Sequence, residues 1–153
     1  MPVKALAAIL NEVCRLFPVD SDAEVTVEAN PDDVTPEWLA ALSHTPVNRL
    51  SMGVQSFDDA LLRLIRRRHT AQQAVCAVEQ AARHGISNVS IDLIYGLPGE
   101  TDERWKRDLQ QAVSLGVEHI SAYHLTYEEG TRIYELLQAH RIHEVDEESS
   151  VRF

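Results

Sequence analysis

Cysteine is scarce in this sequence, since only Cys14 and Cys76 occur among 153 residues. Each lies within a helical pattern, which favours a buried small hydrophobic side chain over a disulfide or a metal-binding pair. A chain without a disulfide framework is typical of a reducing compartment. We therefore expect a cytoplasmic protein with two buried free thiols.

Basic residues and long apolar runs are also few. The 14 lysines and arginines are outnumbered by 24 aspartates and glutamates, so the formal net charge is -10 at pH 7. Such an excess of acid repels phosphate groups, so we expect neither nucleic acid nor an anionic membrane as the main partner. No apolar run approaches the roughly 18 residues that a membrane-crossing helix needs, and no secretion signal opens the sequence. We therefore expect no membrane span.

What the sequence does contain is a regular alternation of helix and strand patterns. After an amphipathic helix at 2–17, strands are expected at 24–29, 49–55, 89–95 and 119–126, and further helices at 35–42, 58–67, 70–85, 102–116 and 131–139. This order predicts an α/β domain with four parallel strands joined by right-handed crossovers. The acidic segment 144–153 looks cut off rather than finished.

Several helix ends carry capping signals. Thr35 is an N-cap followed by a first-turn proline, and the segment 70–73 forms a capping box. Gly85 follows its helix where a left-handed residue is usual. In the helix at 102–116, the residues expected to face inward are Trp105, Leu109, Ala112 and Val113.

The most distinctive stretch is S-I-D-L-I-Y-G-L-P-G-E-T at 90–101. A short apolar run bounded by glycine and proline indicates a buried parallel strand. Alternation places Asp92 on the face opposite Ile91 and Leu93, toward whatever the sheet encloses. A buried carboxylate is unfavourable unless something pairs with it, so Asp92 is a candidate functional residue.

Polar side chains occupy that same face on three successive strands. The polar positions are Thr26, Glu28, Ser51, Gln55, Ser90 and Asp92. Parallel α/β folds bind ligands at the carboxyl ends of their strands. Any one of these side chains alone can be explained by hydrogen bonds to a neighbour. Polar side chains at matching positions on three successive strands instead favour a ligand site. Carboxylates and an amide suit a ribose diol or an ammonium group.

Four motifs carry a family resemblance. They are E-A-N-P (28–31), G-V-Q-S-F (53–57), D-L-I-Y-G-L-P-G-E-T (92–101) and S-A-Y-H-L-T-Y-E-E-G-T (121–131). In order and spacing they resemble the radical S-adenosylmethionine family of oxygen-independent coproporphyrinogen III oxidases, and most of all its heme chaperone branch. The resemblance covers nearly all of the chain. It implies a (β/α)6 partial TIM-like barrel with S-adenosylmethionine lying across the strand ends.

The resemblance also implies a function and a set of site residues. The full-length protein is expected to bind heme or porphyrin and to deliver heme to acceptor proteins; the alternative is oxidative decarboxylation of coproporphyrinogen III to protoporphyrinogen IX. Whether that protein is an enzyme therefore stays open. Glu28, Gln55 and Asp92 match the family's cofactor-contacting positions. Arg67 matches another, and its partner there is the methionine carboxylate. The competing interpretation is that the run of three arginines at 66–68 is merely solvated.

The departures from the family are equally informative. The family's C-x3-C-x2-C motif, which ligates a [4Fe–4S] cluster, is absent, as are its G-G-G-T-P segment and its C-terminal heme-associated elements. We therefore expect residues 1–153 to form a single incomplete core domain, an internal fragment that begins at the helix after the second strand. The cluster and the heme would belong to the full-length protein, and the fragment alone would be inactive.

Two other function classes compete with this interpretation. One is an RNA-modifying radical enzyme, because turns like G-L-P-G-E-T recur there; the acidic charge and the first two motifs argue against it. The other is an unrelated βα domain that binds a small metabolite. The histidines offer little to decide between them. His140 and His143 are expected at a solvated helix end, His124 is expected to be packed or exposed, and His69 needs no functional role.

Overall fold

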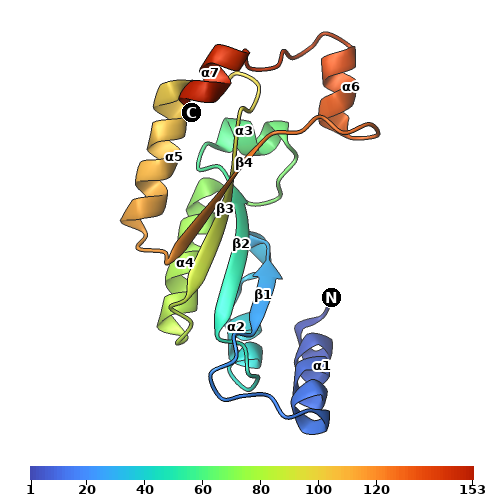
Figure 1. Cartoon of the computed structure of the whole chain (residues 1–153), viewed down its shortest axis with the longest axis vertical. Coiled ribbons are helices and arrows are strands. Elements are labelled where there is room, and N and C mark those ends of the chain that lie inside the picture. The colour runs from blue at the N-terminus through green and yellow to red at the C-terminus, as the bar shows by residue number, and fades with distance from the viewer.

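Four parallel strands form one sheet, in the order β1-β2-β3-β4, in the computed structural model of the chain, which describes residues 1–153 (Figure 1). The strands are β1 (Thr26–Ala29), β2 (Arg49–Gln55), β3 (Val89–Tyr95) and β4 (His119–His124). Each strand pairs only with its neighbours in the sequence. The predicted α/β class with four parallel strands is confirmed.

Seven α-helices and one short 3-10 helix connect and cover these strands. They are α1 (Val3–Leu16), η1 (Pro31–Asp33), α2 (Pro36–Leu42), α3 (Asp59–Leu64), α4 (Ala71–Arg83), α5 (Asp102–Ser114), α6 (Arg132–Gln138) and α7 (Glu147–Arg152). In Figure 1, α4 and α5 lie along one face of the sheet, and α6 and α7 lie beyond the carboxyl ends of the strands. None of the helices is both long and apolar enough to span a membrane.

The core lies between the sheet and the helices on that one face. Alternation predicts that Val25, Val27, Leu50, Met52, Val54, Ile91 and Leu93 face the helices, and all but Val25 are buried in this core. Val25 is half-buried and precedes β1. Alternate residues of β2 are only half-buried, so the opposite face of the sheet is more open. Burying one face and leaving the other accessible is what fixes the register of each strand.

The predicted capping signals agree with the structure, whereas the helix expected at 58–67 ends at Leu64. The Thr35 side chain accepts a hydrogen bond from the Trp38 backbone N–H, and both halves of the Thr70 capping box are formed. Gly85 has φ +87°, a conformation in which a side chain would be strained. These local signals therefore mark where α2 begins and where α4 begins and ends.

Three side chains predicted to be buried are exposed. Val113 is 71% exposed, because α5 turns Trp105, Asp108 and Ala112 inward and leaves Val113 just outside that arc. Cys14 is exposed because α1 buries none of its residues. Cys76 is exposed as well, on the side of α4 away from the sheet. A helical pattern shows which residues share a face, but it does not show how much of that face is covered.

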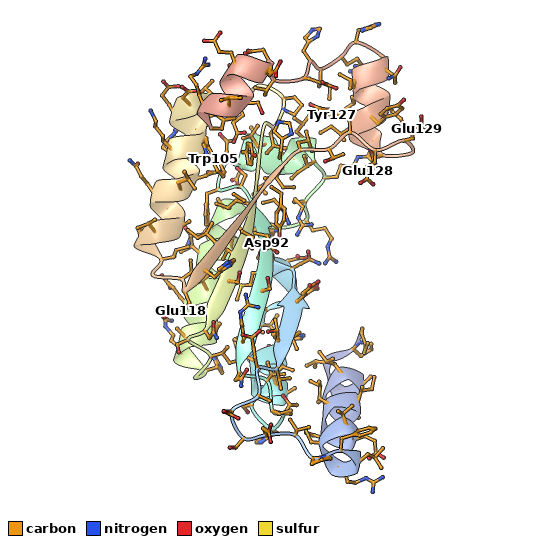
Figure 2. The ribbon with its side chains drawn as sticks, in the orientation of Figure 1. Asp92, Trp105, Glu118, Tyr127, Glu128 and Glu129 are labelled. Carbon is orange, nitrogen blue, oxygen red and sulfur yellow. The ribbon has the colours of Figure 1, made fainter.

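The acidic carboxyl-terminal segment contains a further helix, α7, which the sequence analysis did not predict. Asp146 caps α7 through a hydrogen bond from the Ser149 backbone N–H. The Trp105 indole N–H donates to the Phe153 backbone oxygen at 2.8 Å, which holds α7 against α5. Figure 2 labels Trp105 beside α5, near the carboxyl end of the chain.

Candidate functional site

All four residues proposed to contact the cofactor line one cleft on the open face of the sheet. This polar cleft has a volume of about 440 Å³ and is lined by Met1, Glu28, Ala29, Asn30, Asp33, Ser51, Gly53, Gln55, Arg67 and Asp92. Three strands and the segment after α3 contribute to it. The alternation of the strands, read from the sequence, thus places Glu28, Gln55 and Asp92 on the same side.

Two carboxylates of the polar cleft have no partner within the chain. Glu28 is exposed at the end of β1, and Asp92 is half-buried in β3, where Figure 2 shows it near the middle of the sheet. Neither carboxylate accepts a hydrogen bond or forms an ion pair with another residue. The carboxylate oxygens of Glu28 and of Asp92 are therefore available to hydroxyl or ammonium donors of a ligand.

The Arg67 side chain is held in the cleft by hydrogen bonds rather than freely solvated. Its Nη2 atom donates to the Asn30 side-chain oxygen and to the Gly53 backbone oxygen, each at 2.6 Å. Burial lowers the pKa of Arg67, and the nearby Asp32 opposes this shift. A guanidinium remains charged in proteins, so the cleft has one fixed positive group. The solvated interpretation of the arginine run fits the exposed Arg66 and Arg68 instead.

Gly53 and Gln55 shape the floor of the cleft. A Cβ atom at Gly53 would lie 2.8 Å from the Gln55 side-chain nitrogen and 3.0 Å from Arg67 Nη2, so only glycine leaves both side chains in place. Gln55 has φ +69°, and the pairing of β2 with β3 shifts by one residue just before it. Such a bulge re-aims a side chain, and strain of this kind concentrates at functional sites.

His69 supports this bulge, and the sequence analysis missed it. It is 3% exposed, and its Nε2 atom donates to the backbone oxygen of Val54 at 2.9 Å. Burial is the main reason why the pKa of His69 is lowered, so the ring is neutral, with its proton on Nε2. Its Nδ1 atom is buried without a partner. The histidine thus fixes the residue just before Gln55, and no periodicity in the sequence indicates this.

Two buried carboxyl groups hold the neighbouring loops. Asp108 of α5 accepts hydrogen bonds from the Ser56 hydroxyl at 2.6 Å and the Phe57 backbone N–H at 3.0 Å. Burial raises the pKa of Asp108, and these bonds oppose the shift. Glu100 accepts hydrogen bonds from the backbone N–H groups of Gly96 and Leu97, which closes the turn after β3. Both groups are structural supports of the strand ends rather than walls of the cleft.

The histidines of the last strand and helix form no metal site. The ring of His124 packs edge-on against Tyr95, with the ring centroids 5.2 Å apart, as expected for a packed residue. His140 is exposed, and His143 lies in the segment before α7. Nowhere in the chain do three or more His, Cys, Asp or Glu side chains gather closely enough to hold a metal ion.

A polar cleft across the strand ends of a parallel α/β sheet is the position at which α/β proteins of this class bind their ligands. The sequence model of the Radical SAM superfamily matches residues 2–112. The chain therefore belongs to the radical SAM superfamily.

Relatives of known identity extend this assignment. The heme chaperone HemW of Bacillus subtilis is 41% identical over 141 residues, which are 92% of this chain and 37% of that protein. A mitochondrial radical S-adenosyl methionine domain-containing protein 1 of Bos taurus is 39% identical over 133 residues, 87% of this chain and 30% of that protein. The chain thus spans about a third of the length of the curated relatives it matches.

Solved structures agree on the fold. The coproporphyrinogen III oxidase HemN of Escherichia coli, a radical SAM enzyme, superposes with a TM-score of 0.84 at 24% identity, over 99% of this chain and 35% of that one. The archaeal Elp3 of Methanocaldococcus infernus superposes with a TM-score of 0.80 at 21% identity, over 98% of this chain and 38% of that one. The predicted relation to a radical-SAM barrel is confirmed at the level of fold.

Proposed function

We propose that the chain is the S-adenosylmethionine-binding part of a radical SAM heme chaperone. The residues that hold the cofactor in this proposal are Glu28, Gln55, Arg67 and Asp92. The observation that carries it is the polar cleft, where two unpaired carboxylates, an amide and one half-buried guanidinium meet at the strand ends. The radical SAM family and the names of the curated relatives support the same assignment.

The residues of the cleft fit the chemistry of S-adenosylmethionine. Both hydrogen bonds of Arg67 within the chain use Nη2, so Nη1 and Nε remain free to bind the methionine carboxylate. The carboxylates of Glu28 and Asp92 can accept hydrogen bonds from ribose hydroxyls or from the methionine ammonium group. Bound at a [4Fe–4S] cluster, this cofactor is a source of radical chemistry.

The cluster and the heme iron must then be held by other parts of a longer protein. The chain has no C-x3-C-x2-C motif, so we propose that residues 1–153 are an incomplete core domain. The outer edge of β1 is unpaired, and the hollow that adjoins β1 is lined by apolar residues that include Leu6, Leu10 and Trp38. An unpaired edge next to apolar surface is what a missing neighbouring strand would leave.

We further propose a cytoplasmic protein that passes heme to acceptor proteins.

The alternative function is coproporphyrinogen III oxidation. It is favoured by the superposition on the Escherichia coli oxidase, but at 24% identity that likeness concerns the fold alone. The relatives named heme chaperones are about 40% identical to this chain. We therefore prefer the chaperone.

Binding of S-adenosylmethionine to the full-length protein with its cluster assembled tests the proposal. Asp92→Ala would leave polar groups of the cofactor unpaired, so affinity should fall by about 5- to 150-fold, measured by isothermal titration calorimetry. Asp22→Ala, which removes the same charge from an exposed loop, should leave affinity unchanged. Equal affinity of wild type and Asp92→Ala would exclude the cleft as the cofactor site.

The same preparation separates the two functions. A chaperone should bind heme stably and convert no coproporphyrinogen III, whatever residue stands at position 92. Measured conversion of coproporphyrinogen III to protoporphyrinogen IX that Asp92→Ala abolishes would establish the oxidase instead.

A further inference from the structure

A second pocket adjoins the polar cleft and differs from it in chemistry. It has a volume of about 480 Å³ and is lined by Gln55, Leu64, Ile65, Arg66, Arg67, Ile94, Leu125, Thr131, Arg132 and Ile133. Gln55 and Arg67 line both hollows, so the two are neighbours across the end of β2. We call the second one the arginine-rimmed pocket. Its volume lies in the range of small-molecule and cofactor sites.

The lining of the arginine-rimmed pocket combines apolar and cationic side chains. Five aliphatic residues come from the end of α3, from β3, from the segment after β4 and from α6. Three arginines are added to them, and no acidic residue is present. In a chain with 24 acids and 14 bases, an acid-free pocket with three arginines is unexpected by composition. It is complementary to a ligand that is apolar over most of its surface and carries carboxylates at one edge.

Two of these arginines are free to bind such carboxylates. Arg66 is exposed, and its side chain makes no hydrogen bond or ion pair in the chain. Its backbone has φ +58°, an uncommon conformation for a residue with a side chain. Arg132 pairs only with Glu135 of its own helix, at 2.9 Å, and the two side chains are 43% and 59% exposed. Exposed pairs of this kind are weak, so a ligand carboxylate can replace Glu135.

We propose that the arginine-rimmed pocket binds the propionate edge of a heme or porphyrin. The macrocycle would lie on the aliphatic residues, and its propionates would pair with Arg66 and Arg132. This assignment rests on the proposed function, which makes heme the ligand of the full-length protein. A small inorganic anion would use the arginines but leave the aliphatic residues unexplained.

The pocket binds the periphery of the porphyrin and not its iron. None of its ten lining residues is a histidine, cysteine, methionine or tyrosine, the side chains that usually ligate heme iron. Metal-free protoporphyrin IX should therefore bind as tightly as hemin. The dimethyl ester of protoporphyrin IX, which has the same macrocycle but no charged propionates, should bind more weakly.

Titration of the 153-residue chain with these three compounds, followed by fluorescence or absorbance, tests the proposal. Arg66→Gln and Arg132→Gln should each weaken protoporphyrin IX binding about fivefold, as expected for partly exposed ion pairs, and should not change binding of the ester. The matched control is Arg63→Gln, an exposed arginine of α3 that does not line the pocket; it should bind like wild type. Circular dichroism checks that each variant is folded.

Three results would overturn the proposal. They are equal binding of the acid and the ester by wild type, loss of affinity in Arg63→Gln as large as in Arg66→Gln, and absence of porphyrin binding to the chain. If the variants fail to fold, the comparison of acid with ester in the wild type still decides. None of these results would contradict the proposal for the cofactor site. That proposal is tested separately, by S-adenosylmethionine binding to Asp92→Ala.

Discussion

Glu100 should make the stability of this fold depend on pH. The carboxyl group is 7% exposed, and Oε2 accepts hydrogen bonds from the Gly96 and Leu97 backbone N–H groups at 2.7 and 3.1 Å. Oε1 is buried without a partner. Burial raises the pKa of Glu100 to about 7; Asp108 adds to this, while the two backbone bonds and Arg104 oppose it. The charged form is therefore disfavoured in the fold.

The sign and size follow from the two protonation equilibria. An unperturbed glutamate has a pKa of 4.5, so between that value and about 7 the folded chain holds a proton that the unfolded chain releases. The contribution of protonated Glu100 to the free energy of unfolding is fully present below the pKa of the unfolded chain. It is lost as the pH rises through the pKa of the folded chain. The difference corresponds to roughly 3 kcal/mol of unfolding free energy. Asp108, whose pKa burial also raises, acts in the same direction.

Urea denaturation of wild type and Glu100→Gln near pH 5 and near pH 8 measures this effect. Glutamine keeps an acceptor for the two backbone N–H groups and cannot ionise. The unfolding free energy of Glu100→Gln, taken relative to that of wild type, should rise by up to roughly 3 kcal/mol from the lower to the higher pH. Glu118→Gln removes the same charge from an exposed position and should show no such gain. If the difference between Glu100→Gln and wild type is the same at both pH values, the reasoning about this buried carboxyl is wrong.

Two further predictions concern the floor of the polar cleft. Gly53→Ala should weaken S-adenosylmethionine binding roughly tenfold in calorimetry, because its Cβ displaces Gln55 and Arg67. Asp22→Ala, on an exposed loop outside the cleft, is the control, and wild-type affinity in Gly53→Ala would refute the steric explanation. His69→Ala should lower the unfolding free energy by roughly 1 to 3 kcal/mol in urea denaturation, because the Val54 oxygen loses its donor. His69→Gln, which retains an N–H donor, should recover part of that loss, and a glutamine variant no better than alanine would contradict the positioning role.

The strand faces and the composition of the cleft could be predicted because both depend on a two-residue period. Leu50, Met52 and Val54 are apolar at alternate positions, so the opposite side of β2 follows without any knowledge of the fold. Parallel connection then brings the ends of neighbouring strands to one edge. The presence of Asp92 and Glu28 in one cleft, on strands that flank β2, follows from these two facts.

What could not be predicted depends on contacts between residues distant in the chain. The bond from His69 to Val54 spans 15 positions, and the bond from Ser56 to Asp108 spans 52. No local pattern encodes either pair. The exposure of Cys14 has the same origin, because the sequence of α1 shows an apolar stripe but not whether another element covers it.

The run of three arginines shows how the backbone can divide one sequence feature among different tasks. A regular helix would place the consecutive residues 66–68 about 100° apart, but α3 ends at Leu64 and Arg66 has a positive φ. The turn directs Arg67 into the polar cleft, where Asn30 and the Gly53 oxygen fix it, and leaves Arg66 at the adjoining pocket without a partner. If a ligand bound to Arg67 changes the affinity of Arg66 for a second ligand, the second ligand must change the affinity for the first by the same factor. The turn at the end of α3 is therefore the place where cofactor and porphyrin binding would be coupled.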